Sequence, residues 1–188
     1  MDHAQFITAA KFDALRNAIY HVARRQYYDG LNRLLNFLVI ILGAGVAGKA
    51  ASLIEVRDLW LEIGVLVAAT AQLAFDFGYR ARTHEILQKK YYEMIAEMEV
   101  DDASDLKKWN AKLYTIASDE PMPMRALDAL AYNAALDATM SDPVLKAEHR
   151  IYVPFIHRLF KHLIAFNGHE YVLESERSSL WRRRAKEN

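Results

Sequence analysis

The sequence of 188 residues contains no cysteine, which excludes disulfide bonds, thiolate zinc sites and a cysteine nucleophile. It also lacks an excess of either charge: 24 basic residues balance 24 acidic ones, and this argues against a nucleic-acid-binding protein driven by bulk charge. No Gly-rich phosphate loop, Ser/His/Asp order or metalloprotease motif is present. We therefore expect no enzyme, no cofactor and no nucleic-acid partner.

Two further features are missing. No stretch alternates apolar and polar residues over a useful length, so strands are not expected and the sequence predicts an all-α fold. The seven histidines include no pair at the spacing that binds a metal on one helix face, and no metal site is predicted. The first 30 residues carry several charges and no apolar run, which argues against a cleavable signal peptide.

What the sequence has is two long apolar runs. Leu31 to Ser52 includes NRLLNFLVIILGAGVAGKAA, and Leu59 to Tyr79 reads LWLEIGVLVAATAQLAFDFGY. Each run has about 20 residues, enough for a helix to cross a hydrocarbon core of about 30 Å. The connection is so short that the two helices must form an antiparallel hairpin.

The hairpin could be the core of a soluble helical bundle or could lie in a bilayer. A helix that is apolar on all sides must be covered on all sides, and a chain of 188 residues has little material to cover two of them. Basic residues flank the hairpin, from Arg24 to Arg33 and from Arg80 to Lys90, and its loop has few. We therefore predict two transmembrane helices in the inner (cytoplasmic) membrane with both termini cytoplasmic.

Small and polar residues recur along the two apolar runs at spacings that let membrane helices approach closely. The residues predicted to pack the helices are Asn36, Gly43, Ala47, Gly48, Gly64, Ala68, Ala74 and Gly78. One stripe of the second run carries side chains that are costly to expose to lipid. These predicted pore-lining residues are Glu62, Val65, Ala69, Gln72 and Asp76. The alternative is that Glu62 and Asp76 lie at the two interfaces and reach the headgroups.

The rest of the chain is predicted to be helical and cytoplasmic. Residues 1–30 form an amphipathic helix with Phe12, Leu15, Ile19 and Val22 on one face, ending at Asp29-Gly30; residues 31–79 form the hairpin; residues 80–188 form a helical region. The helix of the second run continues without interruption to about residue 100. Further helices begin at a Ser104 cap, after Pro123, and at Asp142-Pro143, the last running to Phe166 with a kink at Pro154.

Residues 150–168 also suggest a basic amphipathic surface helix. The predicted membrane-surface residues are Arg150, Arg158 and Lys161 of this helix and Arg182, Arg183 and Arg184 of the C-terminal tail. Phe155, Leu159, Leu163 and Phe166 would form the opposite, apolar face. We expect that apolar face to pack on the neighbouring helices, with binding to an anionic leaflet as the alternative.

Several segments in this order resemble the SLATT family, two-transmembrane effectors associated with SMODS nucleotidyltransferases and SLOG proteins in bacterial conflict systems. They are RRQYYDGLNRLLNF, the two-span hairpin, DFGYRARTHEILQKKYYEMIAEME and DEPMPMRALDALAYNAALD. The resemblance covers nearly the whole chain and implies a membrane effector that forms pores or disrupts the membrane. Nothing in the chain resembles a nucleotidyltransferase or a dinucleotide fold.

We therefore expect a homo-oligomeric, pore-forming membrane effector of antiphage defence, whose partners are the lipid bilayer and other copies of the chain. Its activating signal, a signalling nucleotide or a separate sensor protein, must come from a partner or bind the helical region. The alternatives are a non-conducting scaffold or adaptor that recruits partners through its cytoplasmic helices, and a holin-like lysis protein with the same hairpin.

Overall fold

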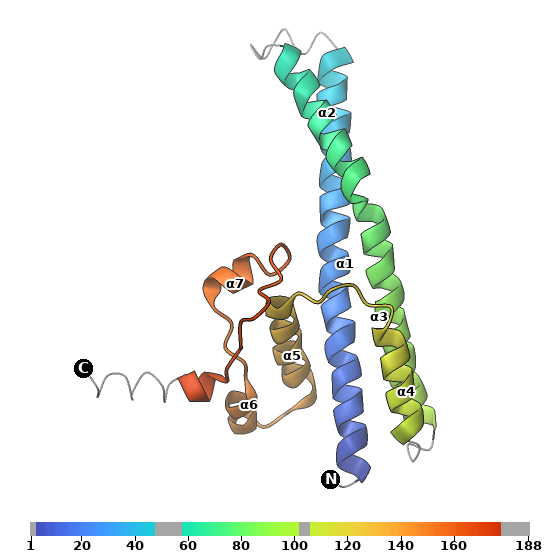
Figure 1. Ribbon diagram of the computed structural model, residues 1–188, viewed down its shortest axis with the longest axis vertical. Coiled ribbons are helices and arrows are strands. Elements are labelled where there is room, and N and C mark those ends of the chain that lie inside the picture. Colours follow the sequence, from blue (N-terminus) through green and yellow to red (C-terminus); the bar gives the residue numbers. More distant parts are fainter. Residues whose placement is uncertain (1–2, 48–57, 102–105, 178–188) are drawn as a thin grey trace, which may run out of the picture. The chain divides into compact units, whose positions relative to one another are not determined.

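The computed structural model describes residues 3–47, 58–101 and 106–177, and they are helical with no named strand among them. Figure 1 labels seven helices. They are α1 (His3–Ala47), α2 (Asp58–Phe75), α3 (Phe77–Val100), α4 (Leu106–Ala117), α5 (Arg125–Thr139), α6 (Pro143–His149) and α7 (Phe155–Leu159). The all-α prediction is confirmed for this part of the chain.

The chain divides into two compact units. The hairpin unit is Ala23–Glu85, and the helical domain is Met1–Val22 with Ile86–Asn188. Because α1 and α3 each contribute residues to both units, the chain passes from one unit to the other within these helices. The predicted helical segments are present, but the boundaries between the two units lie inside helices rather than at helix ends.

The core of the helical domain is formed by the first part of α1, the later part of α3, and α4 (Figure 1). The buried residues of α1 here are Ala10, Ala14 and Ala18, whose spacing of four places them on one face. Leu87, Tyr91, Met94 and Met98 of α3 and Trp109 of α4 complete the cluster. The predicted face with Phe12 and Leu15 is only half-buried, because small alanines let the helices approach more closely.

A second, smaller core lies under α5. Ala126 and Ala129 of α5 pack with Val153, and Phe166 and Tyr171 cover them. Arg16 joins α1 to this helix through an ion pair with Asp128. The C-terminal part of the domain is thus tied to α1 by charge and by apolar contacts.

Three predicted helix boundaries are wrong. α1 continues through Asp29-Gly30, because one glycine in a helix interior costs only about 1 kcal/mol and long helices absorb this. The helix after the second apolar run is interrupted at Asp76, between α2 and α3. The single helix expected up to Phe166 is replaced by α6 and α7, because residues 150–152 adopt extended backbone that pairs with residues 172–174.

Two predicted details are confirmed. Asp142 caps α6, its carboxylate accepting a hydrogen bond from the Val144 N–H at 2.8 Å, with Pro143 at the first helical position. The chain ends α4 at Ala117, before Pro121 and Pro123. The predicted Ser104 cap lies outside the described residues.

Candidate functional site: an apolar hairpin with a polar seam

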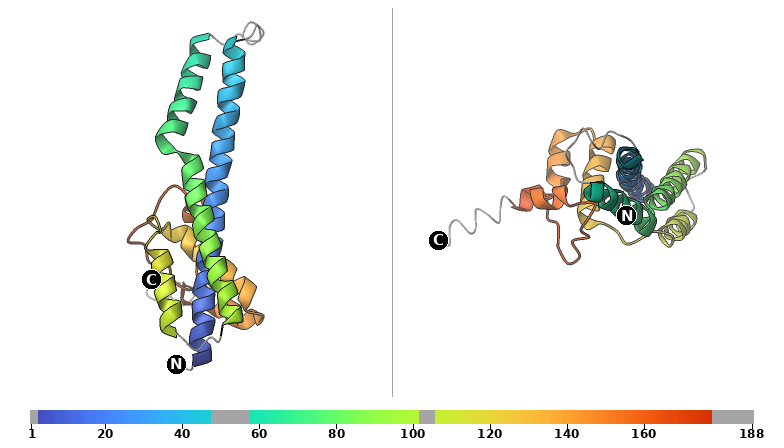
Figure 2. Two further views of the ribbon diagram at one scale, coloured as in Figure 1. Left: turned by 90° about the vertical axis from the view of Figure 1, so that its right-hand side faces the viewer. Right: turned by 90° about the horizontal axis from the view of Figure 1, so that it is seen from above.

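The hairpin unit pairs α1 with α2 and the start of α3 in antiparallel register (Figure 2). Three contacts set this register. A Cβ on Gly64 would lie 3.1 Å from Leu42, Gln72 is bonded to Asn36, and a Cβ on Gly78 would lie 3.9 Å from Asn32. Residue numbers rise along α1 as their partners fall along α2 and α3, which is the order of a hairpin.

Most of the apolar surface of this hairpin is exposed. One helical stretch, Trp60–Val100, is long and apolar enough to cross a membrane, and only 6% of its apolar window is buried within the protein. The exposed large side chains of residues 60–79 are Trp60, Ile63, Leu66, Val67, Leu73, Phe75 and Tyr79, and those of α1 are Leu34, Phe37, Ile40 and Ile41. A water-soluble bundle would hide such side chains inside.

The apolar run of α1 is described only as far as Ala47, so the first of the two predicted spans extends beyond the described residues. Within the described part, residues 34–47 carry no charge. The described residues therefore contain one stretch that fits a membrane span, and it is paired with the uncharged, partly exposed part of α1 at residues 34–47.

A polar pair lies between the two helices. Gln72 Nε2 donates a hydrogen bond to Asn36 Oδ1 at 2.6 Å. The sequence assigned Gln72 to a pore lining and Asn36 to a packing seam, and the structure brings the two side chains together. Each amide thereby satisfies part of its hydrogen-bonding capacity within one chain, which is how polar residues hold membrane helices together.

The predicted pore-lining stripe divides into two sets. Glu62, Ala69 and Asp76 are exposed, whereas Val65 and Gln72 are half-buried beside α1. The exposed three are seven residues apart, a spacing that keeps side chains on one helix face. One exposed face of α2 therefore carries Glu62, the only charged residue among residues 59–75, together with Ala69. Asp76, directly after α2, continues this line.

Asp76 forms the joint between α2 and α3. Its φ of +40° is left-handed, a region in which aspartate is tolerated better than most residues. Its carboxylate accepts a hydrogen bond from the Tyr79 N–H at 3.1 Å, and Arg80 Nε donates to the Phe75 carbonyl at 2.9 Å. Asp76 thus ends one helix and caps the next, a structural role that its place in the predicted pore lining did not anticipate.

The predicted packing residues also separate. Gly64 and Gly78 face α1, and Ala68 is buried. Gly43 has open space around it and Ala74 is exposed, so neither contributes to the contact within the hairpin. The side chain of Ala47 and the whole of Gly48 lie outside the described residues.

A buried group of cationic and aromatic side chains lies near the start of the hairpin unit. Arg24 sits over the ring of Tyr28, 4.5 Å from its centroid, and the Tyr28 ring stacks on His84 at 5.6 Å. All three side chains are buried. In the sequence Arg24 counts only as a charge that flanks the hairpin, but its spacing of four residues from Tyr28 places the two side chains on one helix face and signals this contact.

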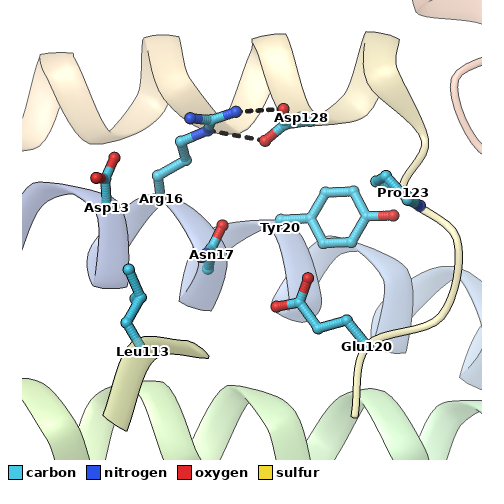
Figure 3. Close-up of a pocket in the computed structure, with 8 residues that line it drawn as sticks. All are labelled: Asp13, Arg16, Asn17, Tyr20, Leu113, Glu120, Pro123 and Asp128. Atoms are coloured by element: carbon cyan, nitrogen blue, oxygen red, sulfur yellow. Dashed lines mark hydrogen bonds and ion pairs between the residues drawn. The ribbon is translucent and has the colours of Figure 1, made fainter. Parts of the chain in front are cut away.

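The helical domain contains a polar pocket of about 320 Å³ (Figure 3). It is lined by Asp13, Arg16, Asn17, Tyr20, Leu113, Glu120, Pro123 and Asp128. The Arg16 guanidinium binds both carboxylate oxygens of Asp128. The backbone N–H of Met124 donates to the Tyr20 hydroxyl at 3.0 Å, which holds the Pro-rich loop over α1.

Glu120 is the centre of a second group beside the pocket. His21 Nε2 lies 3.1 Å from its Oε1, and the Tyr91 hydroxyl donates to the same oxygen. Burial raises the pKa of Glu120, but the hydrogen bonds from His21 and Tyr91 outweigh this and lower it below its usual range. The sequence analysis missed this group, because its members come from α1, α3 and the loop after α4.

Asp13 is a further carboxylate of the pocket. Burial raises the pKa of Asp13, and the charge of Asp128 adds to this while Arg16 opposes it. Three carboxylates therefore face one guanidinium, which is already paired. This charge balance does not favour the phosphates of a nucleotide. Among the described residues, no three His, Asp or Glu side chains are placed to hold a metal ion.

The predicted membrane-surface residues have different surroundings. Arg150 forms an ion pair with Asp137 and Arg158 Nε donates to the Val153 carbonyl at 2.9 Å. Phe155, Leu159 and Leu163 are exposed rather than packed on the described part of the domain, and only Phe166 of the predicted apolar face packs there. Residues 182–184 lie outside the described residues.

The comparisons with known proteins add no relative: no protein-family model, no curated protein and no solved structure matches this chain.

Proposed function

We propose that the chain is an integral membrane protein of the inner membrane that crosses the bilayer twice, assembles with copies of itself and acts as a pore-forming or membrane-perturbing effector. The observation that carries this proposal is the exposed apolar surface of the hairpin. Only 6% of the apolar window in the stretch Trp60–Val100 is buried within the protein. Lipid covers such a surface without a protein partner.

The length of the helical stretch from Trp60 in α2 to Tyr79 in α3 supports a membrane span. Trp60 and Tyr79 are both exposed, and these residue types prefer the two membrane interfaces. At 1.5 Å per residue they lie about 28 Å apart along the helix direction, close to the thickness of about 30 Å of a hydrocarbon core. Glu62 and Asp76 then lie within a turn of the two boundaries.

The basic residues at one end of the hairpin support cytoplasmic termini. Asn32 adjoins Gly78, so the exposed Arg33 and Arg80 that follow them lie at the same end of the hairpin. Positive charge next to a span favours the cytoplasmic side. On this proposal the chain enters the membrane from α1 and leaves it into α3 on that side.

Self-assembly is supported by the uncovered polar face of α2. Glu62 is exposed on α2 among mostly apolar exposed side chains, and a carboxylate that faces lipid is costly, although less so near the boundary than at the helix centre. A ring of hairpins would turn Glu62, Ala69 and Asp76 toward a shared lumen, where carboxylates favour cations. Gln72 is then a packing residue rather than part of the lumen.

The role in antiphage defence rests on the resemblance to the SLATT family. The acidic pocket favours a separate sensor protein over a nucleotide as the activating signal at that position, because three carboxylates line it and its one guanidinium is already paired with Asp128.

The test is ion and dye leakage from liposomes that contain the purified protein, alongside the mass of the protein in detergent. We expect a cation-selective leak from an oligomer, a loss of selectivity in Glu62→Gln with the mass unchanged, and a weaker hairpin without altered selectivity in Gln72→Leu. The neutralising change Glu93→Gln on the exposed side of α3 is the matched control.

Selectivity that follows Gln72 rather than Glu62 would contradict this lining. A monomer that leaves the membrane on alkaline extraction would contradict the whole proposal, and an intact oligomer that never leaks would favour the non-conducting scaffold.

A further inference from the structure

The segment 155–164 has one face that no described residue covers. Its six large apolar side chains occur as adjacent pairs that recur every four residues, which is the spacing of one helix face. They are Phe155, Ile156, Leu159, Phe160, Leu163 and Ile164, all exposed. The exposed fraction is 76% for Phe155 and 63% for Leu159, values expected of charged rather than aromatic or aliphatic side chains.

The opposite face of the segment is anchored to the domain. The His157 ring stacks on Phe166, with centroids 3.9 Å apart, and His157 Nδ1 lies 2.8 Å from the Tyr171 hydroxyl. Phe166 and Tyr171 in turn pack on the core of α5 and Val153. Turning the apolar side chains inward would break these contacts, so the outward face is a stable feature of the domain.

Backbone hydrogen bonds hold both ends of the segment. Before it, the Tyr152 N–H donates to the Val172 carbonyl and the Glu174 N–H donates to the Arg150 carbonyl, both at 2.9 Å. After it, the Arg125 N–H donates to the Ala165 carbonyl at 3.2 Å. A surface that is already ordered loses little conformational entropy when it binds.

The charge of the segment selects the kind of partner. Residues 155–164 contain Arg158 and Lys161 and no acidic residue. Exposed apolar side chains interleaved with basic ones are typical of surfaces that lie in the interface of an anionic bilayer. The core of a protein–protein interface is instead depleted of lysine. Since α1 and α3 connect this domain directly to the hairpin unit, a membrane that holds the hairpin is always within tethering range.

We propose that segment 155–164 is a second, monotopic membrane contact, which inserts its apolar side chains into the interface of an anionic leaflet. This inference rests on the proposed anchoring of the hairpin. Phe155, Leu159 and Leu163 enter the acyl boundary, and Lys161 and Arg158 meet lipid phosphates. Docking of the domain then depends on lipid charge, whereas insertion of the hairpin does not.

The absence of cysteine permits a direct test on the full chain, because a single introduced cysteine is the only labelling site. An environment-sensitive fluorophore is attached to Leu159→Cys, to Leu66→Cys in the hairpin, or to Ala138→Cys on the exposed side of α5. Each labelled protein is reconstituted into vesicles of neutral phosphatidylcholine or of phosphatidylcholine mixed with phosphatidylglycerol, and an aqueous quencher is added.

We expect the label at Leu66 to be protected in both vesicles, the label at Ala138 in neither, and the label at Leu159 only in the anionic ones. Lys161→Glu should lower the ratio of protected to quenched Leu159 label at least about five-fold, the effect of one basic side chain near an anionic surface. Lys107→Glu, the same charge change on exposed α4, should leave the ratio unchanged.

Two results would overturn the inference. A Leu159 label that is quenched in anionic vesicles as strongly as the Ala138 label would show that the segment stays in water. A Leu159 label that is protected equally in both vesicles, to a degree that grows with protein density, would show that a second copy covers the face. Quenching at Leu66 as well would mean that the hairpin is not anchored, which separates failure of the proposed function from failure of this inference alone.

Discussion

The hairpin unit and the helical domain distribute the same residue types in opposite ways. In the helical domain Leu87, Met94 and Trp109 are buried, while charged side chains form ion pairs on the surface, as Lys90 does with Asp119. In the hairpin unit the large apolar side chains face outward, and the amides of Asn36 and Gln72 bond to each other across the two helices. This difference is what the proposed placement of the hairpin unit in lipid and of the helical domain in water predicts.

The two units also differ in what holds their helices together. The helical domain uses burial of large side chains plus a hydrogen-bonded group in which Tyr91 and His21 meet the Glu120 carboxylate. In the part of the hairpin unit that runs through its apolar segments, the helices meet at a close approach at Gly64, at the buried Ala68 and at the amide pair of Asn36 and Gln72; the buried Arg24, Tyr28 and His84 lie near the start of the unit. Burial of apolar surface drives association only in water, so a hairpin in lipid must depend on packing and hydrogen bonds.

The largest expected effect separates exposed apolar residues of the two units. Leu66→Arg should weaken membrane insertion by about 2.5 to 3.5 kcal/mol, because the side chain faces lipid. Tyr114→Arg in α4, at a comparably exposed position, should change stability by less than about 0.5 kcal/mol. The measurement is the fraction of protein that resists alkaline extraction from membranes. Equal tolerance of the two changes would mean that both units face water.

The next effect concerns the group around Glu120. Glu120→Ala should destabilise the helical domain by about 1 to 3 kcal/mol, because the buried Tyr91 hydroxyl and His21 lose their acceptor. Glu97→Ala, which removes an exposed pair with Lys112, should cost less than about 1 kcal/mol. Thermal unfolding followed by circular dichroism in detergent compares the two variants.

The same group predicts a pH dependence. Because the folded-state pKa of Glu120 is lowered, the unfolded chain binds more protons in acid, and the stabilisation is complete above the usual glutamate pKa of 4.5 and is lost as the pH falls below it. The unfolding temperature of the wild-type domain should fall faster with acid than that of Glu120→Gln. Parallel curves would contradict the assigned role.

A smaller effect is expected at the joint. Asp76→Ala should cost about 1 to 2 kcal/mol, since it removes a helix cap and places a residue less tolerant of the left-handed region there. Asp76→Asn keeps both the conformation and the capping oxygen and should be nearly neutral. The stability of the hairpin against denaturant in detergent is the measurement, and equal losses in the two variants would assign the effect to the charge instead.

The smallest expected effect is the coupling between Asn36 and Gln72. In a double-mutant cycle with Asn36→Leu and Gln72→Leu, the interaction should be about 0.6 kcal/mol, the average for hydrogen bonds between membrane helices. Hairpin stability in detergent measures it. A coupling near zero would return Gln72 to the lumen and remove the polar seam from the comparison between the units.

Periodicity and run length were enough to predict helices at α4 and α5, the cap at Asp142 and the pairing of two apolar runs. They failed at two helix boundaries. The glycine of Asp29-Gly30 does not end α1, and the helix predicted to continue from the second apolar run is interrupted at Asp76, whose carboxylate caps α3. They also failed at α7, where extended backbone pairing across some twenty residues shortens the helix.

The sequence by itself determined the all-helical character, the apolar hairpin and its end rich in basic residues, because these follow from composition and from spacing along one helix. Only the tertiary structure decided that Gln72 meets Asn36, that Glu120 gathers His21 and Tyr91, and that the apolar face of segment 155–164 points outward. These contacts join residues that are far apart in the chain. Their energies depend on which partner arrives at hydrogen-bond distance, and no local pattern contains that information.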